Sequence, residues 1–412
     1  MMDFERAAVP YWPIRRRKIL RRNILIALCI LAVAGSVFAI RYHLAREPMA
    51  ARVFDDVAST VSLRYYDRSF HGVDWHALTA RYRPRVLAAP TVAERYRLLQ
   101  EMVATLGDSH TAVFSPADVA RAGADDDLAA GLGAAFVRIG DERVVVRVAP
   151  HSPAAVAGLR PGFIVAERTA SGDRDLVRSY AIRDPVSGRS WRRRVRLAGN
   201  RPFDTLQSPD LDWGVAAPGV GYLKMSSFPN DIQEALGWAV SDIGAHPAMI
   251  LDLRGNPGGL IDAVDATAGI FLPRGTLVVT GAGRYHWLGR RIFTASDVAG
   301  VHYNGRLAVL VDGNSESGAE ALASALQLQK RAVIVGLPTA RKVLGVEVQE
   351  RLPDGGVLRV ATLDMRDEQG TLLEGKGVTP DVIVPRTAAD IARGRDPQLH
   401  AAIAALSPVA AH

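Results

Sequence analysis

The sequence predicts a multidomain α/β protein, with a helical region first, a β-rich module next and an α/β domain last. Near the amino terminus, Val53, Val57 and Val61 recur at the spacing of one helix face. In the middle, glycine-rich turns flank a short apolar strand, Val144–Val148. From Val220 onward, unbroken apolar strands alternate with Ala- and Leu-rich helices, which is typical of a buried parallel sheet. A chain of 412 residues is long enough for several buried cores.

Changes in composition along the chain divide it into segments. We expect a cytoplasmic tail and membrane anchor at 1–45, a helical cap at 50–120, a β-rich module at 125–205, an α/β domain at 206–390 and a tail helix at 391–412.

The amino-terminal segment carries the strongest targeting signal. A cluster of arginines and lysine at 15–22 precedes 24–40, a run without any charged side chain. That run is at the short end of what can span a bilayer. The basic cluster predicts a cytoplasmic amino terminus and translocation of the remaining chain. A cleaved signal peptide is the alternative, but Val37-Phe38-Ala39 is a poor cleavage site, so we expect an uncleaved anchor in the inner membrane.

Charge and cysteine content limit the possible functions. The net charge is +7, and residues 1–23 contain seven basic and two acidic side chains. The remaining chain is close to neutral, so nothing indicates a nucleic-acid partner. Cys29 is the only cysteine and lies in the predicted anchor. The exported part therefore can form no disulfide and no cysteine metal site.

One stretch of the last domain carries the chemistry. A buried strand, Leu307–Val311, turns into a helix whose first residues include Ser315 and Ser317, and a second strand, Ala332–Val335, leads to Lys342. A serine at such a turn has its hydroxyl at the positive end of the helix dipole, which favours an oxyanion. A lysine one parallel strand later can return to the same place. The simpler interpretation is that the serine only caps the helix and the lysine is solvated.

The spacing of two motifs favours the chemical interpretation. Residues 311–320 align without a gap to V-N-x-G-S-A-S-A-S-E, and residues 336–342 align to G-E-x-T-F-G-K. The stretch therefore resembles the C-terminal processing peptidases, which are serine peptidases of the tricorn-like superfamily with a Ser–Lys pair. The resemblance implies a ClpP/crotonase-like domain, Ser317 as nucleophile, Lys342 as general base, a protein or peptide substrate, and no metal or other cofactor.

A glycine pair supplies the expected oxyanion hole. Residues 252–259, DLRGNPGG, match the family motif D-L-R-x-N-x-G-G. Glycines after a strand let the backbone approach a substrate closely. The resemblance implies one oxyanion donor here, which we assign to the N–H of Gly258, with Gly259 as the second choice. The other donor is the N–H of Gly318.

A histidine is the second candidate for the base. Residues 106–111, LGDSHT, resemble the L-G-D-x-H-T segment of the same superfamily. In its tricorn-like branch the matching histidine is the general base. Because Lys342 aligns with the lysine of the other branch, we expect His110 to be structural or auxiliary. The alternative is a Ser–His peptidase with an acidic partner such as Glu347.

The middle module resembles the PDZ domains of these peptidases, in residues 131–134 and 150–162. The backbone N–H groups of Leu132 and Gly133 can hold a terminal carboxylate, and the adjoining strand edge can pair with a peptide. Phe163 stands where the family usually has Asp, so a purely structural module is the alternative.

The surroundings of Lys342 depart from the family pattern. Ala340 and Arg341 replace Phe-Gly, and Glu316 replaces a small residue beside the nucleophile, where a carboxylate can keep the lysine charged. The family's orienting glutamine is replaced by Val346, which leaves Glu347 or Gln349 for that role.

The expected mechanism needs a neutral lysine. A free lysine has a pKa of about 10.4, and burial in an apolar site favours its neutral form. Val343, Leu344 and Val346 predict such a site around Lys342.

These expectations combine into a membrane-anchored serine endopeptidase that cuts exported proteins near their C-terminal tails, outside the cytoplasm. The alternative from another class is an inactive relative that binds peptides as a scaffold. The oligomeric state stays open.

Overall fold

The computed structural model describes most of the chain after the amino-terminal segment. The described residues are 48–120, 132–168, 177–197, 210–230, 232–285, 287, 289–298, 300–346 and 348–407. The predicted anchor at 24–40 lies outside them. No helix within these ranges has the length and apolar character needed to cross a membrane.

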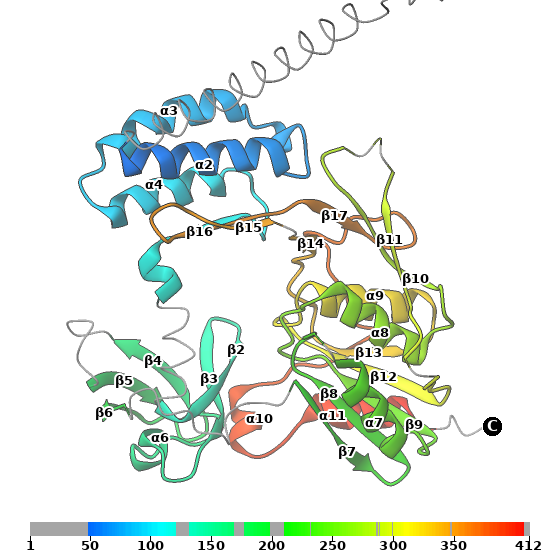
Figure 1. Ribbon diagram of the computed structural model, residues 1–412. Helices are drawn as coiled ribbons and strands as arrows, with labels where there is room; N and C mark the ends of the chain where they lie inside the picture. Colours follow the sequence, from blue (N-terminus) through cyan, green and yellow to red (C-terminus); the bar gives the residue numbers. More distant parts are fainter. Residues whose placement is uncertain are drawn as a thin grey trace, which may run out of the picture.

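The cap consists of three helices on a small sheet. The helices are α2 (Met49–Arg64), α3 (Trp75–Ala88) and α4 (Val92–Ala104), with a 3-10 turn, η1 (Phe70–Gly72), before α3. The predicted valine stripe is confirmed, because Val53, Val57 and Val61 are fully buried in α2. The sheet has the order β1-β16-β15, with β1 (Ala112–Phe114), β15 (Val348–Arg351) and β16 (Val357–Val360). The cap core therefore includes strands from the C-terminal half of the chain (Figure 1).

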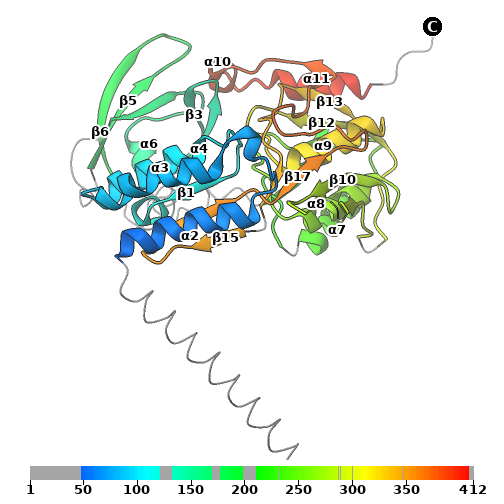
Figure 2. The same ribbon diagram turned by 90° about the horizontal axis from the view of Figure 1, so that it is seen from above.

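The β-rich module is a five-stranded antiparallel sheet in the order β2-β3-β4-β5-β6. Its elements are β2 (Ala134–Ile139), β3 (Glu142–Val148), α6 (Pro153–Val156), β4 (Ile164–Arg168), β5 (Val177–Arg183) and β6 (Ser190–Arg196). The module has its own core, and helix α10 (Ala388–Ala392) covers a second apolar face through Ala388 and Ile391. Figures 1 and 2 show α10 between this module and the α/β domain.

The α/β domain contains a six-stranded sheet in the order β18-β13-β12-β9-β8-β7. Its strands are β7 (Leu211–Ala217), β8 (Val220–Met225), β9 (Ala248–Asp252), β12 (Arg306–Val311), β13 (Val333–Gly336) and β18 (Val382–Ile383), and all pairs except β7–β8 are parallel. The predicted strands at Val220–Met225 and Leu307–Val311 are confirmed.

Helices cover both faces of this sheet, as an all-buried parallel sheet requires. One face packs against α7 (Ile232–Ile243), α8 (Ile261–Phe271) and α9 (Gly318–Leu328), and the other packs against α11 (Pro397–Ala405). The predicted tail helix is thus two short helices, α10 and α11, each with its own docking surface.

A fourth sheet, in the order β11-β10-β17-β14, connects the α/β domain to the cap. It contains β10 (Leu277–Ala282), β11 (Arg291–Thr294), β14 (Leu344–Gly345) and β17 (Leu363–Arg366). Strand β14 of this sheet and strand β15 of the cap sheet follow Lys342 closely in the chain.

Candidate active site

The predicted nucleophile lies on a strained turn. Ser317 has φ 54°, in the left-handed region that non-glycine residues rarely adopt, and it is the N-cap residue of α9. Its backbone N–H donates to the carbonyl oxygen of Lys342 at 2.9 Å and to Oε2 of Glu320 at 3.1 Å. Such strain persists only where surrounding contacts fix the backbone. The turn therefore holds the Ser317 hydroxyl at the amino end of a buried helix.

The glycine loop lies directly against this turn. Gly258 has φ 93°, and a Cβ there would be 2.8 Å from the Cβ of Ser317 and 2.9 Å from the nitrogen of Gly318. Gly258 and Gly318, the two predicted oxyanion donors, thus both lie beside Ser317. The N–H of Gly258, however, donates to Oδ1 of Asn256 at 2.8 Å. Among the described residues no acceptor takes the N–H of Gly318 or of Gly259, so these two are available to an oxyanion.

Glu320 joins the nucleophile turn to the segment that carries the predicted base. Its side chain is fully buried, and burial raises its pKa, while its hydrogen-bond donors act against that rise. One carboxylate oxygen accepts from the N–H of Lys342 at 2.9 Å and from Ser317, and the other accepts from the N–H of Arg341 at 2.8 Å and from the hydroxyl of Thr339. A single carboxylate therefore sets the distance between the two segments.

Lys342 does not lie in an apolar pocket. Its side chain is 46% exposed, and its Nζ lies 3.0 Å from Oε1 of Glu316. The prediction of a buried lysine is wrong, because Val343 and Leu344 are themselves buried in the domain and cap cores and do not enclose the amine. The Lys342 amine instead forms an exposed ion pair with Glu316, the residue that replaces a small one beside the nucleophile.

His110 belongs to a hydrogen-bonded array that the sequence did not reveal. Its Nδ1 lies 2.6 Å from Oγ of Ser109, and Ser109 donates through its N–H and its hydroxyl to Glu374 at 2.9 Å and 3.0 Å. Glu374 also accepts from the N–H of Val343 at 2.8 Å. Burial lowers the pKa of His110, while the charge of Glu374 acts in the opposite direction. The array therefore holds an imidazole that favours the neutral form.

Ser109 and Glu374 were not predicted as site residues, although the sequence contained a signal for each. Ser109 lies inside the LGDSHT segment, and Glu374 directly precedes the glycine-rich stretch Gly375-Lys376-Gly377. Neither position could be paired with the other, because 265 residues separate them. Of the orienting candidates, Glu347 lies outside the described residues, and Gln349 lies in β15 opposite Arg359.

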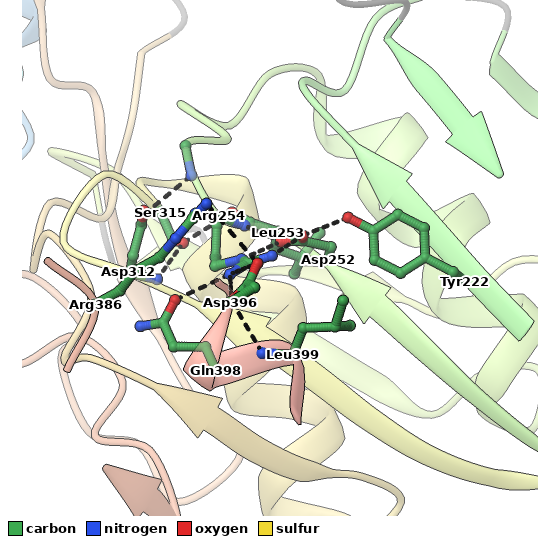
Figure 3. Close-up of polar contacts among 11 residues, drawn as sticks. Tyr222, Asp252, Leu253, Arg254, Asp312, Ser315, Arg386, Asp396, Gln398 and Leu399 are labelled. Carbon is green, nitrogen blue, oxygen red and sulfur yellow. Dashed lines mark hydrogen bonds and ion pairs between the residues drawn. The ribbon is translucent and has the colours of Figure 1, made fainter. Parts of the chain in front are cut away.

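A buried charge network surrounds Arg254, which lies just before the glycine loop in the sequence (Figure 3). Arg254 lies between Asp252, at 2.6 Å, and Asp396, at 2.9 Å, and the hydroxyl of Tyr222 donates to Asp252. Burial alone would raise the pKa of Asp252, but the Arg254 guanidinium holds that pKa well below its usual range. Asp396 is also the N-cap of α11, so this network ties the C-terminal helix to the DLRGN motif.

Further hydrogen bonds join the glycine loop to the nucleophile turn. The hydroxyl of Ser315 donates to the carbonyl oxygen of Leu253 at 2.8 Å, and the N–H of Gly255 donates to Asp312 at 3.0 Å. Ser315 is thus a structural residue ahead of the helix, whereas the sequence suggested that it begins the helix. The two loops form one rigid unit around Ser317.

The predicted carboxylate loop of the β-rich module is only partly described. Leu132 has its side chain in the module core, and the carbonyl of Gly133 accepts from Ala149 and from the Ser152 hydroxyl. At the far end of β2, the carbonyl of Arg138 accepts from Nδ2 of Asn314 at 2.9 Å. The module therefore contacts the nucleophile turn directly.

This fold and site define a class of protein. A serine on a strained strand-to-helix turn, with a glycine loop packed against it, is an arrangement found in serine hydrolases. Residues 219–384 match the model of peptidase family S41, and residues 50–104 match the tricorn protease C1 domain.

Known proteins similar to this chain include C-terminal processing peptidases. The chain is 28% identical over 363 residues to the carboxyl-terminal-processing peptidase 2, chloroplastic, of Arabidopsis thaliana, covering 81% of this chain and 69% of that protein. It is 29% identical over 365 residues to the carboxyl-terminal-processing protease of Synechocystis sp., covering 83% of each. This chain contains a peptidase family S41 domain and a tricorn protease C1 domain, and it is similar to serine peptidases of the C-terminal processing type.

Solved structures share the fold. The photosystem II D1 C-terminal processing protease superposes with a TM-score of 0.59 at 24% identity, covering 82% of this chain and 94% of that one. The tricorn protease superposes with a TM-score of 0.50 at 15% identity, covering 87% of this chain and 36% of that one. The predicted fold class is confirmed.

Proposed function

We propose that this chain is an endopeptidase that cuts exported proteins near their C-terminal tails, with Ser317 as its nucleophile. The observation that carries the proposal is the contact between the Ser317 turn and the Gly258 loop. In the proposed reaction the Ser317 oxygen attacks the peptide carbonyl, and the N–H groups of Gly318 and of Gly258 or Gly259 hold the oxyanion. The leaving amine takes a proton from the base, and water then releases the acyl group.

Lys342 is the base that the family motif assigns. Its backbone is fixed beside Ser317 by two hydrogen bonds, so only its side chain has to reach the hydroxyl. The pairing of its amine with Glu316 has to be given up first, since an ammonium cannot accept the proton.

His110 is the second candidate for the base. The array formed with Ser109 and Glu374 favours it, because an imidazole that is neutral near pH 7 and held by a partner is suited to proton transfer. Glu374 also bonds to the residue after Lys342, so both candidates are held in one region.

Three variants of the full-length chain test this proposal with unstructured reporter peptides. Ser317→Ala is expected to abolish cleavage, while the control Ser59→Ala, on the exposed side of α2, leaves it unchanged. Loss of cleavage in Lys342→Ala identifies the lysine as the base, and loss in His110→Ala with activity in Lys342→Ala identifies the histidine. Peptide binding without cleavage in the unaltered chain supports the scaffold alternative instead.

Recognition of chain ends would belong to the β-rich module, which we propose to be PDZ-like. The N–H groups of Leu132 and Gly133 would hold the terminal carboxylate, and the edge strand β2 would pair with the peptide. Peptides with a free and with an amidated carboxyl end test this, because only the free end carries the charge. Equal cleavage of both would contradict tail recognition.

Residues 24–40 would anchor the enzyme in the inner membrane with its catalytic part outside the cytoplasm. The uncharged run and the basic cluster before it support this placement. The orientation is measured by adding a protease to spheroplasts that contain the Cys-labelled or tagged chain and following which part of the chain is cut. A protected C-terminal half would contradict the proposed orientation.

A further inference from the structure

Glu316 occupies a position from which it can control the predicted base. It directly precedes Ser317, and its N–H donates to the carbonyl of Asn256 at 2.8 Å. Its backbone is therefore fixed in the nucleophile turn, while its side chain is one-third exposed and reaches Nζ of Lys342.

The backbone of Lys342 is fixed as firmly as that of Glu316. Its carbonyl accepts from Ser317 and its N–H donates to the buried Glu320. Only the flexible side chain can move, and it is nearly half exposed. The amine lies on the Glu316 carboxylate, and its proposed role as base requires it to move to the hydroxyl of Ser317.

These two positions have opposite consequences for catalysis. On Glu316 the amine donates to the carboxylate at 3.0 Å and is held in an ion pair. On Ser317 it must be neutral to accept the hydroxyl proton. Each amine that is bound to Glu316 is thus withdrawn from the reaction.

We propose that Glu316 is a latch on the base, which keeps the active site in a resting state by pairing with Lys342. This inference rests on the proposed role of Lys342 as base. The pair is partly exposed, so it is weak and reversible, and salt screens it. A substrate that displaces the pair, or a cation that screens it, would release the amine toward Ser317.

The test compares Glu316→Gln with the unaltered full-length chain on one reporter peptide. The amide fills the same space without the charge, so kcat/KM is expected to rise about threefold to tenfold at low salt. The unaltered enzyme is expected to gain activity as sodium chloride increases, while the Glu316→Gln enzyme shows little salt response. Glu234→Gln, an equal change of charge in the first turn of α7, is the matched control.

A double variant separates the latch from an effect on the histidine. Glu316, Glu374 and Asp108 all favour the charged form of His110, and Arg359 opposes them, so removing Glu316 also acts on that imidazole. The latch predicts that the gain disappears in Glu316→Gln/Lys342→Ala. A gain that survives in the double variant, or a single variant that is slower than or equal to the unaltered enzyme, overturns the latch.

Failure of the latch is distinguishable from failure of the proposed peptidase. Cleavage by the unaltered chain that Ser317→Ala abolishes establishes the peptidase whatever Glu316 does. Cleavage that survives Ser317→Ala overturns both.

Discussion

The backbone N–H of Ser317 donates to the carbonyl oxygen of Lys342 across 2.9 Å, so the predicted nucleophile and the predicted base are joined through their main chains. Two residues that are far apart in the sequence thereby keep a fixed spacing. Their side chains do not share this constraint, because the Lys342 amine pairs with Glu316. The main chain therefore sets the spacing of Ser317 and Lys342, while the ion pair with Glu316 sets the position of the Lys342 amine.

Removing the Glu320 carboxylate should damage both stability and activity. Glu320→Ala removes the acceptor of the Arg341 and Lys342 N–H groups and of the Thr339 hydroxyl, while the N–H of Ser317 keeps the carbonyl of Lys342. Each buried unsatisfied donor costs about 1–3 kcal/mol, so we expect the free energy of unfolding to fall by about 3 kcal/mol or more. We expect kcat/KM to fall at least tenfold, on the order of 1.4 kcal/mol of transition-state stabilisation, because the Ser317 and Lys342 segments lose their shared partner.

Urea unfolding and steady-state kinetics measure these two effects. Glu320→Gln keeps one carbonyl oxygen as an acceptor and should lie between the alanine variant and the unaltered chain. An alanine variant with unchanged stability and activity would refute the role of this carboxylate.

A methyl group at Gly258 should disable the site. Its Cβ would lie 2.8 Å from that of Ser317, and the residue has φ 93°, which non-glycine residues rarely adopt. We expect Gly258→Ala to lower kcat/KM by about a hundredfold or more, because the added Cβ would displace Ser317 and the N–H of Gly318, a proposed oxyanion donor. Gly255→Ala is the matched control, because Gly255 also has a positive φ, 73°, but open space where its Cβ would stand. Equal losses of activity in the two variants would show that backbone strain alone is responsible.

The pH profile should reveal which base acts. Burial lowers the pKa of His110 below its ordinary value of 6.5, so a histidine base is neutral and active already below neutral pH. In that case kcat/KM should rise below about pH 6.5 and level off by pH 7. A profile without a rise in this range would contradict a histidine base.

Glu374→Gln sharpens this measurement. The charge of Glu374 favours the imidazolium, so removing it should move a histidine-controlled rise to lower pH and reduce the plateau through the lost contacts to Ser109. Glu368→Gln, an exposed position that bonds to Gln329, is the control. An unmoved profile in Glu374→Gln would exclude the histidine as the titrating group.

The elements of the site could be predicted from the sequence where neighbouring residues determine the structure. The strand Leu307–Val311 is an unbroken apolar run, and the Gly258 loop needs residues without a Cβ, so each follows from neighbouring positions. The contacts between these pieces follow because carboxyl ends of neighbouring parallel strands meet at one edge.

The rest depends on contacts between distant residues. Ser109 and Glu374 are 265 positions apart, and no periodicity in either segment indicates that they meet. The position of the Lys342 amine was mispredicted from its apolar neighbours in sequence, because those side chains turn into the cores while the amine follows the charge of Glu316. The local sequence pattern predicted the backbone of this segment, whereas the position of the Lys342 amine follows from its ion pair with Glu316, 26 positions away.

The buried ion pair behind the glycine loop should be essential for stability. Arg254→Ala leaves Asp252 fully buried without its charged partner, and breaking such a pair costs about 3–5 kcal/mol. Because Arg254 holds the pKa of Asp252 below its unfolded value, the stabilisation is complete above pH ~4 and is lost as the pH falls further. Arg254→Ala should therefore reduce the free energy of unfolding at pH 7 and flatten its dependence on acid, measured by urea unfolding between pH 3 and pH 7. Arg83→Ala, which breaks an exposed pair with Asp55, should change little, and equal effects of the two variants would contradict a structural role for the buried pair.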